Sequence, residues 1–357
     1  MLQRFWGLLL ATGGCLAGVE AADVRISKPE PDQVVRSHQL VLSGHAVAED
    51  GPNMVSISRK LSSAANSTEI AQAMLDGNGD WTATVPLVPG TQLLVVTLAG
   101  ATDQILVTRA GDAIGRQPPQ KVRLQWVNGT DEKQQVDRQI RLVAERTLDP
   151  PPAEPQLSAF VDDVKGRVRQ LFVERFQGVA NLVVVDQDGP DVHTVNFLAT
   201  DDGLFGQSPF DCGSVSRNEA TEVHVGTYRR SMSNLGQWKP MQRGDLPSVR
   251  AEDLARCLAR TAAHEVGHSL GLVGDPAVPA WKCLWMRGCE EGHNCFSITD
   301  TFDIADRFDD GWYLMDSGPR TTNRARLGEE FESRRSLVRR APVFNTFNRS
   351  YLQIVHP

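Results

Sequence analysis

His264, Glu265 and His268 are the residues whose types and spacing point most directly to chemistry. They lie in the run TAAHEVGHSLGL, residues 261–272. Two histidines four residues apart stand one turn above each other on the same face of a helix, so both imidazoles can reach one metal ion. Glu265 lies beside the first histidine, where it can hold a metal-bound water without ligating the metal. The pattern predicts a zinc site that activates water.

A long helix must position these side chains. Leu258, Ala262, Val266 and Leu270 step by four along a different face of it, which predicts a buried face opposite the metal ligands. The sequence Pro247-Ser248 predicts the start of this helix, with Ser248 as a cap. Gly271 predicts its end, because glycine permits the positive φ that a sharp turn requires.

A second motif lies downstream, Tyr313-Leu314-Met315-Asp316-Ser317-Gly318. With the H-E-x-x-H-x-x-G helix, it resembles the Met-turn of the metzincin zinc peptidases. The resemblance covers roughly residues 124–357, strongly in the two motifs and loosely elsewhere. It implies an α+β zinc peptidase domain in which Met315 forms the floor beneath Zn²⁺ and Glu265 acts as general base.

The third zinc ligand departs from the family pattern. Metzincins usually place it three residues after the glycine, where this chain has Gly274. Asp275 is one residue further, and small bacterial metzincins such as snapalysin use aspartate. His293 would require a long insertion, which leishmanolysin-like metzincins tolerate. Because imidazole is the commoner zinc ligand, we favour His293 over Asp275. The alternative without a metal is that Asp275 is a turn residue and His293 a surface loop residue.

Two functions from different classes follow from these residues. The first is a secreted zinc endopeptidase acting on protein or peptide substrates, in which His264, His268 and His293 hold Zn²⁺ and Glu265 takes the proton from the attacking water. The second is an extracellular binding protein on a metzincin scaffold that has lost its third ligand. The intact Glu265 favours the enzyme, because a structural zinc site has no use for a general base.

The N-terminus resembles a secretory signal peptide, residues 1–21. Arg4 precedes an apolar stretch, residues 5–19, and Val19-Glu20-Ala21 fits a cleavage site. The stretch is too short for a good bilayer span, so no stable membrane insertion is expected, and lipidation at Cys15 is the minority alternative. Export predicts an oxidising compartment and disulfides among the remaining cysteines. Cys212 and Cys257 are one candidate pair.

Two domains are expected after the signal. Residues 22–110 read as short strands broken by turns and predict an all-β sandwich, and residues 76–91 resemble bacterial immunoglobulin-like modules. Residues 111–120 form a Gly/Pro-rich linker. Residues 121–357 form the metzincin-like domain, with a helix in 159–177 and strands in 181–185, 193–199 and 222–228. His193 and His224 lie in these strands and are interpreted as structural.

Composition narrows the classes of partner. The chain has 357 residues, a net charge of −7 and 6% aromatic residues. The sequence has no cluster of basic residues and no aromatic pattern suited to stacking on bases, so no nucleic-acid partner is expected. No glycine-rich phosphate loop and no G-x-S-x-G elbow occurs, so the common rival enzyme classes have no motif here. The oligomeric state is left open.

Overall fold

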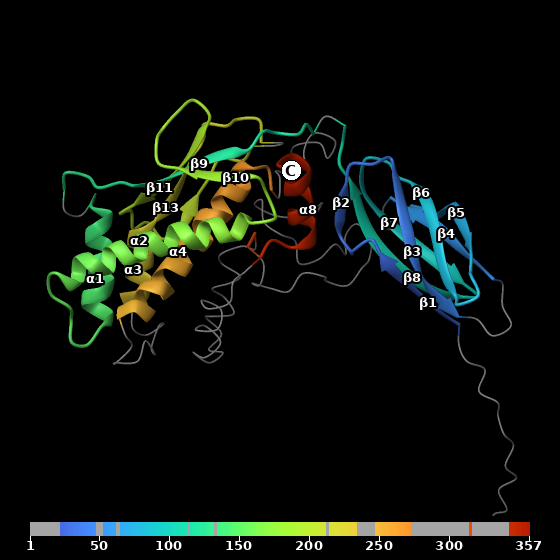
Figure 1. Cartoon of the computed structure of the whole chain (residues 1–357), viewed down its shortest axis with the longest axis horizontal. Coiled ribbons are helices and arrows are strands. Elements are labelled where there is room, and N and C mark those ends of the chain that lie inside the picture. The colour runs from blue at the N-terminus through green and yellow to red at the C-terminus, as the bar shows by residue number, and fades with distance from the viewer. Residues whose placement is uncertain are drawn as a thin grey trace, which may run out of the picture.

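The chain forms two groups of elements at opposite ends of an elongated molecule, with the C-terminal helix between them (Figure 1). The computed structural model describes residues 22–47, 53–61, 65–112, 114–131, 134–211, 214–233, 247–272, 314–315 and 343–357.

The first group consists of eight strands in two sheets. They are β1 (Asp23–Lys28), β2 (Gln33–Val35), β3 (Gln39–Val47), β4 (Met54–Lys60), β5 (Thr68–Met74), β6 (Asp80–Pro86), β7 (Gly90–Leu98) and β8 (Ala101–Arg109). One sheet has the order β1-β3-β6 and the other β2-β8-β7-β4-β5. All pairs are antiparallel except β2 with β8.

The two sheets pack face to face around a shared apolar core. Strand β6 alternates exposed and buried side chains along its length, as a strand with one solvated face must. Trp81 and Leu42 from one sheet join Val96 and Ile105 from the other in one buried cluster. Short strands were expected across residues 22–110, and the eight described strands lie within that range. The immunoglobulin-like character of the sandwich stays a prediction.

The second group is a mixed α/β unit. Its elements, in chain order, are β9 (Gln120–Trp126), α1 (Val136–Thr147), α2 (Gln156–Phe176), β10 (Leu182–Val185), β11 (Val192–Leu198), β12 (Gly206–Gln207), β13 (Ala220–His224), α3 (Val225–Ser233) and α4 (Pro247–Ser269). The sheet order is β10-β9-β11-β13-β12. Its strands are parallel except for β12, which runs antiparallel to β13 at the edge.

The expected strand over residues 222–228 is wrong in its second half. The strand ends at His224, and helix α3 begins at Val225. Val223 and Val225 alternate as in a strand, while Val225 and Tyr228 are spaced as on a helix, so periodicity could not separate the two. At the start of this helix, Gly226 approaches the carbonyl oxygens of Ala199 and Thr200 so closely that a Cβ there would lie within 2.5 Å of both. The position therefore requires glycine.

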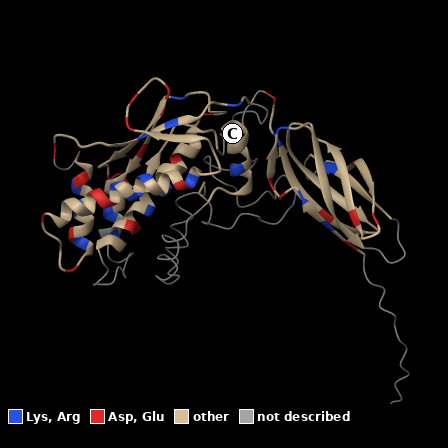
Figure 2. Cartoon of the chain, viewed as in Figure 1, with Lys and Arg blue, Asp and Glu red and all other residues tan. Residues whose placement is uncertain are grey.

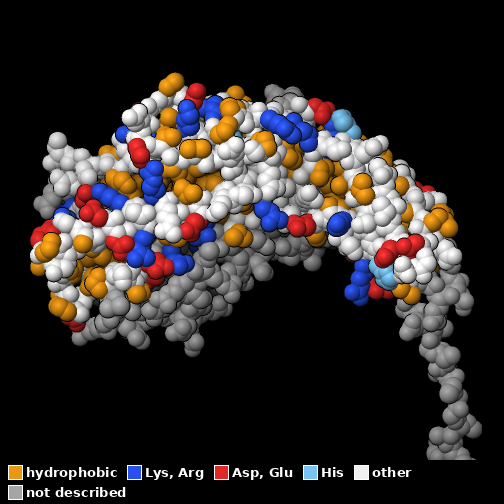
Figure 3. Space-filling view, viewed as in Figure 1, with side chains coloured by type: hydrophobic (Ala, Val, Ile, Leu, Met, Phe, Trp, Pro, Cys, Tyr) orange, Lys and Arg blue, Asp and Glu red, His pale blue; other side chains and the backbone are white. Residues whose placement is uncertain are grey.

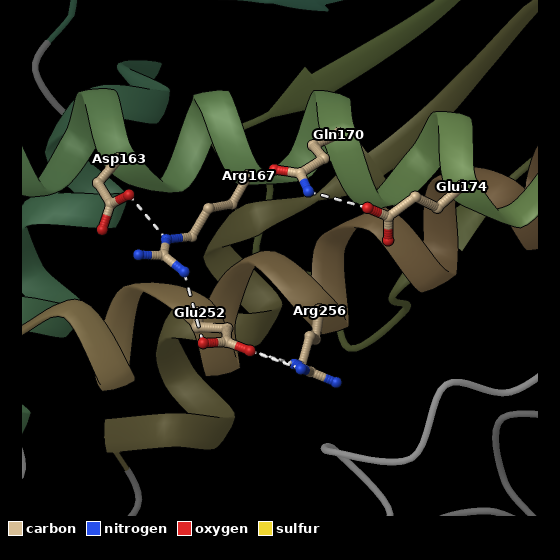
Figure 4. A network of polar contacts seen from close by, with 6 residues as sticks. All are labelled: Asp163, Arg167, Gln170, Glu174, Glu252 and Arg256. Atoms are coloured by element: carbon tan, nitrogen blue, oxygen red, sulfur yellow. Dashed lines mark hydrogen bonds and ion pairs between the residues drawn. The ribbon is translucent and has the colours of Figure 1, made fainter.

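Helices α2 and α4 pack side by side along one face of the sheet (Figure 1). Their outer sides are linked by a polar network, drawn in Figure 4. The guanidinium of Arg167 on α2 donates to Asp163 at 2.7 Å and to Glu252 on α4 at 3.4 Å. Glu252 also accepts from Arg256 at 3.0 Å. These groups are partly exposed, so they set the alignment of the helices more than their stability.

The C-terminal helix α8 (Thr346–Val355) contacts both groups of elements. The backbone N–H of Val34 on β2 donates to Ser350 Oγ at 2.8 Å, and Arg349 pairs with Glu30 at 2.8 Å. On the other side, the rings of Phe344 and Phe176 lie 5.3 Å apart. The last residues of the chain therefore join the sandwich to the α/β unit.

The charged side chains carry both signs on the same surfaces. Figure 2 shows the positions of Lys and Arg (blue) interspersed with those of Asp and Glu (red) along α1, α2 and α4, and Figure 3 shows the same mixture of side chains in the space-filling view. None of the described helices has the length and apolar composition needed to cross a bilayer.

His193 on β11 makes the stability of the fold depend on pH. Burial lowers the pKa of His193 from 6.5 to about 4. In the unfolded chain His193 is protonated below about pH 6.5, whereas in the folded chain it is protonated only below about pH 4. The free energy of unfolding therefore decreases as the pH falls from 6.5 to 4. Between pH 7.5 and pH 5 we expect His193 to account for a loss of about 2 kcal/mol.

Denaturant unfolding at the two pH values, for wild type and His193→Gln, measures this loss. The variant should show a pH dependence smaller by about that 2 kcal/mol, whatever its absolute stability at pH 7.5. An equal pH dependence in the two proteins would contradict the assignment.

Candidate metal centre

Helix α4 carries the two histidines and the glutamate, and it ends as the sequence predicts. Leu258, Ala262, Val266 and Leu270 are buried, at most 1% exposed. Gly271 has φ of 89°. The N–H of Leu272 donates to Gly267 O, and that of Gly271 donates to His268 O, both at 2.9 Å. This pair of bonds is a Schellman motif, which stops the helix directly after the turn that carries His268.

His264 and His268 point at each other from successive turns. Their Nε2 atoms lie 3.1 Å apart, and their ring planes cross at 85°. Two nitrogens bound tetrahedrally to one Zn²⁺ at about 2.0–2.1 Å would lie about 3.3–3.4 Å apart. The observed separation is thus within a few tenths of an ångström of the one a shared zinc ion requires.

The turn at Leu314 and Met315 docks beneath this pair. His264 Nδ1 lies 2.6 Å from the carbonyl oxygen of Leu314, fifty residues away in the chain. With Nδ1–H donating to that carbonyl, the neutral ring presents Nε2 as its acceptor, which is the tautomer a metal ligand needs. Leu314 and Met315 are fully buried.

Gly267 allows the close contact between α4 and Met315. A Cβ at Gly267 would lie 2.6 Å from Met315 Sδ and 3.1 Å from its Cε, so the thioether packs against the bare backbone of the helix between the two histidines. Met315 therefore lies against the helix turn that carries the histidines, and its role as the floor of a zinc site stays a prediction.

Glu265 is buried at the side of the helix that faces the edge strand. Its side chain is 7% exposed, and burial raises its pKa to about 8. A Cβ at Gly206 on β12 would lie 2.8 Å from Glu265 Oε1 and 2.7 Å from Thr261 Cγ2. The edge strand thus passes directly over the glutamate, with room for no side chain at Gly206.

Sequence reasoning missed the groups around Glu265. Gly206 and Thr261 border it, and Tyr228 on α3 hydrogen-bonds Thr261 through its hydroxyl. Burial raises the pKa of Tyr228, so it stays a neutral phenol. The four-residue spacing between Thr261 and Glu265 puts them on the same face of the helix, so the sequence could have indicated that Thr261 borders Glu265. Nothing local in the sequence links Gly206 or Tyr228 to the helix, because they lie on β12 and α3 and only the tertiary fold brings them against α4.

The third ligand falls outside the described residues, as do Gly274, Asp275 and His293. Among the residues that the structure describes, no group of three His, Cys, Asp or Glu side chains is arranged to hold a metal ion. Cys257 on α4 is a free thiol whose pKa burial raises to about 12. Its suggested partner Cys212 also lies outside the described part of the chain.

Comparisons with known proteins identify no family. No protein-family model matches the chain, and no curated protein matches it. Three solved structures give partial matches: an engineered protein with 20% sequence identity and a TM-score of 0.20, an amylomaltase from Corynebacterium glutamicum with 11% and 0.22, and a putative glycoside hydrolase from Bacteroides vulgatus with 11% and 0.18.

These matches cover 26%, 52% and 63% of this chain. The chain in turn spans 21%, 22% and 40% of the matched structures. TM-scores this low do not indicate a shared overall fold, so neither fold nor function is taken from these proteins.

The contact of Gly267 with Met315 can be tested by a double-mutant cycle. In Gly267→Ala the added methyl must displace the thioether, at a cost of about 1–3 kcal/mol that the better helix propensity of alanine offsets by up to about 1 kcal/mol. The same change in a Met315→Ala background should cost clearly less, because the space is already open. Denaturant unfolding of the four proteins measures the coupling, and additive costs would show that the two residues do not touch.

Proposed function

We propose that the chain is an exported zinc-dependent endopeptidase, with His264 and His268 as two of its zinc ligands and Glu265 as its general base. The observation that carries the proposal is the 3.1 Å separation of the two Nε2 atoms, combined with the bond from His264 Nδ1 to the Leu314 carbonyl. Export rests on the N-terminal sequence alone, and the third ligand is proposed to be His293, with Asp275 as the alternative.

The residues present fit a zinc ion in donor chemistry as well as in spacing. Two imidazoles are typical of catalytic zinc sites, and a carbonyl that orients one of them is a typical outer partner. When bound, the ion would lower the pKa of water to near 7 and polarise a carbonyl oxygen. The buried Met315 would support the site from below without ligating.

Glu265 would move the proton in this reaction. Its carboxylate would accept a proton from the attacking water and return it to the leaving amine. Burial holds the pKa of Glu265 near 8, and a cation between the neighbouring imidazoles would favour the charged form and lower that pKa.

The edge strand β12 offers a way to orient a peptide substrate. Among the described strands, β12 pairs only with β13, so its other edge has no described strand beside it. An extended peptide can add to such an edge through main-chain hydrogen bonds. Because Gly206 lies against Glu265, a peptide paired there would run past the general base.

Glu265→Gln separates chemistry from metal binding. We expect this variant to keep its zinc and to lose peptide hydrolysis by about 10²–10⁴-fold, because it removes the proton acceptor and leaves both imidazoles in place. Hydrolysis of unfolded casein and zinc content are measured together on the wild type and the variant, with His45→Ala, at an exposed histidine of the sandwich, as a control.

Full zinc-dependent hydrolysis by Glu265→Gln would overturn the mechanism. A wild type that binds zinc and hydrolyses no peptide would favour the other candidate, an extracellular binding protein on a scaffold that has lost catalysis.

A further inference from the structure

The strand β12 is too short to hold its own position, yet it borders the general base. It contains only Gly206 and Gln207, which pair with Val223 and Glu222 of β13. A two-residue pairing contributes few ladder hydrogen bonds, and isolated short pairs are marginal in water. Contacts beyond this short ladder therefore help to fix the distance between Gly206 and Glu265.

Four side chains form a continuous chain of polar contacts around this strand. His224 Nδ1 lies 2.9 Å from Asp202 Oδ1, in the segment that leads into β12. His224 Nε2 lies 3.3 Å from Glu222 Oε2. The same carboxylate oxygen accepts from the Gln207 amide at 2.5 Å. The contacts reach the residues on both sides of Gly206, and we call these four side chains the β12 clamp.

His224 is the centre of the clamp. Its side chain is 2% exposed, while those of Asp202 and Glu222 are 43% and 36% exposed. Both of its ring nitrogens lie near carboxylate oxygens, and because a carboxylate only accepts, each of these contacts requires an N–H on the nitrogen concerned. The hydrogen bond from His224 helps to hold the pKa of Asp202 below its ordinary value, against the opposing effect of burial.

Backbone hydrogen bonds also connect the clamp residues to the segment before β12. The N–H of His224 donates to Phe205 O at 2.9 Å, and the N–H of Leu204 donates to Asp202 Oδ1 at 3.0 Å. Asp202 therefore binds the ring of His224 and the chain immediately before β12 at once. Removing its carboxylate would release both contacts.

We propose that His224 is a positioning residue, which acts through Asp202, Glu222 and Gln207 to hold β12 against Glu265. The role in catalysis rests on the proposed function, while the role in holding β12 stands on the geometry alone. At Gly206 the packing against Glu265 has no spare space, so a shift of β12 would change the placement of the carboxylate and of a peptide paired with the strand.

The test compares Asp202→Ala with Asp202→Asn. The alanine variant removes the acceptor, whereas the amide oxygen of asparagine can still accept from His224 and from Leu204. Hydrogen exchange of the peptide spanning residues 200–208 should speed up by about tenfold or more in Asp202→Ala and stay within about threefold of wild type in Asp202→Asn. The peptide spanning residues 192–198, in β11, is the internal control and should not change.

Kinetics then separate positioning from folding. With zinc content unchanged, Asp202→Ala should lower kcat for peptide hydrolysis by about tenfold, and Asp202→Asn should restore most of it. Unchanged exchange over residues 200–208 in Asp202→Ala would overturn the clamp, even if the protein proves to have no peptidase activity. Faster exchange with unchanged kcat in an active enzyme would overturn the positioning role.

Discussion

The contact between His264 Nδ1 and the Leu314 carbonyl oxygen is the interaction on which the candidate site depends. It joins residues that are fifty positions apart and fixes the tautomer of the first imidazole. The second imidazole follows from the helix, because His268 lies one turn further on the same face. Without the docked turn, the helix would still bring the two rings near each other, but the ring of His264 would lack the partner that orients its Nε2.

Two glycines place the neighbouring parts of the chain close to this helix. At Gly267 the missing side chain admits the thioether of Met315 from one side, and at Gly206 it admits the edge strand over Glu265 from another. Both contacts are too close for a Cβ. The buried face of α4, packed against α2 and the sheet, gives the helix the rigidity that a site built on close contacts requires.

The sequence allowed the helix, its buried face and its glycine end to be predicted, because these depend on local periodicity and on the conformation of one residue. It also singled out Met315, through a motif that is contiguous in the chain; Met315 contacts the helix at Gly267, and its role beneath a zinc ion stays a prediction. It did not locate Gly206, Tyr228 or the β12 clamp. Gly206 and the clamp lie at the edge of the sheet and Tyr228 lies on α3. Their places relative to α4 depend on tertiary packing, which no local pattern in this chain encodes. The boundary between β13 and α3 was not predicted because Val225 fits both the two-residue period of a strand and the 3.6-residue period of a helix.

Zinc content per chain, by elemental analysis of protein purified without chelators, tests the central claim most directly. The account predicts one zinc per chain in the wild type, its loss in His264→Ala, and its retention in His45→Ala, which removes an exposed histidine of the sandwich. The same measurement on His293→Ala and Asp275→Ala assigns the third ligand. A wild type without stoichiometric zinc, or a His264→Ala variant that keeps its zinc, would contradict the account.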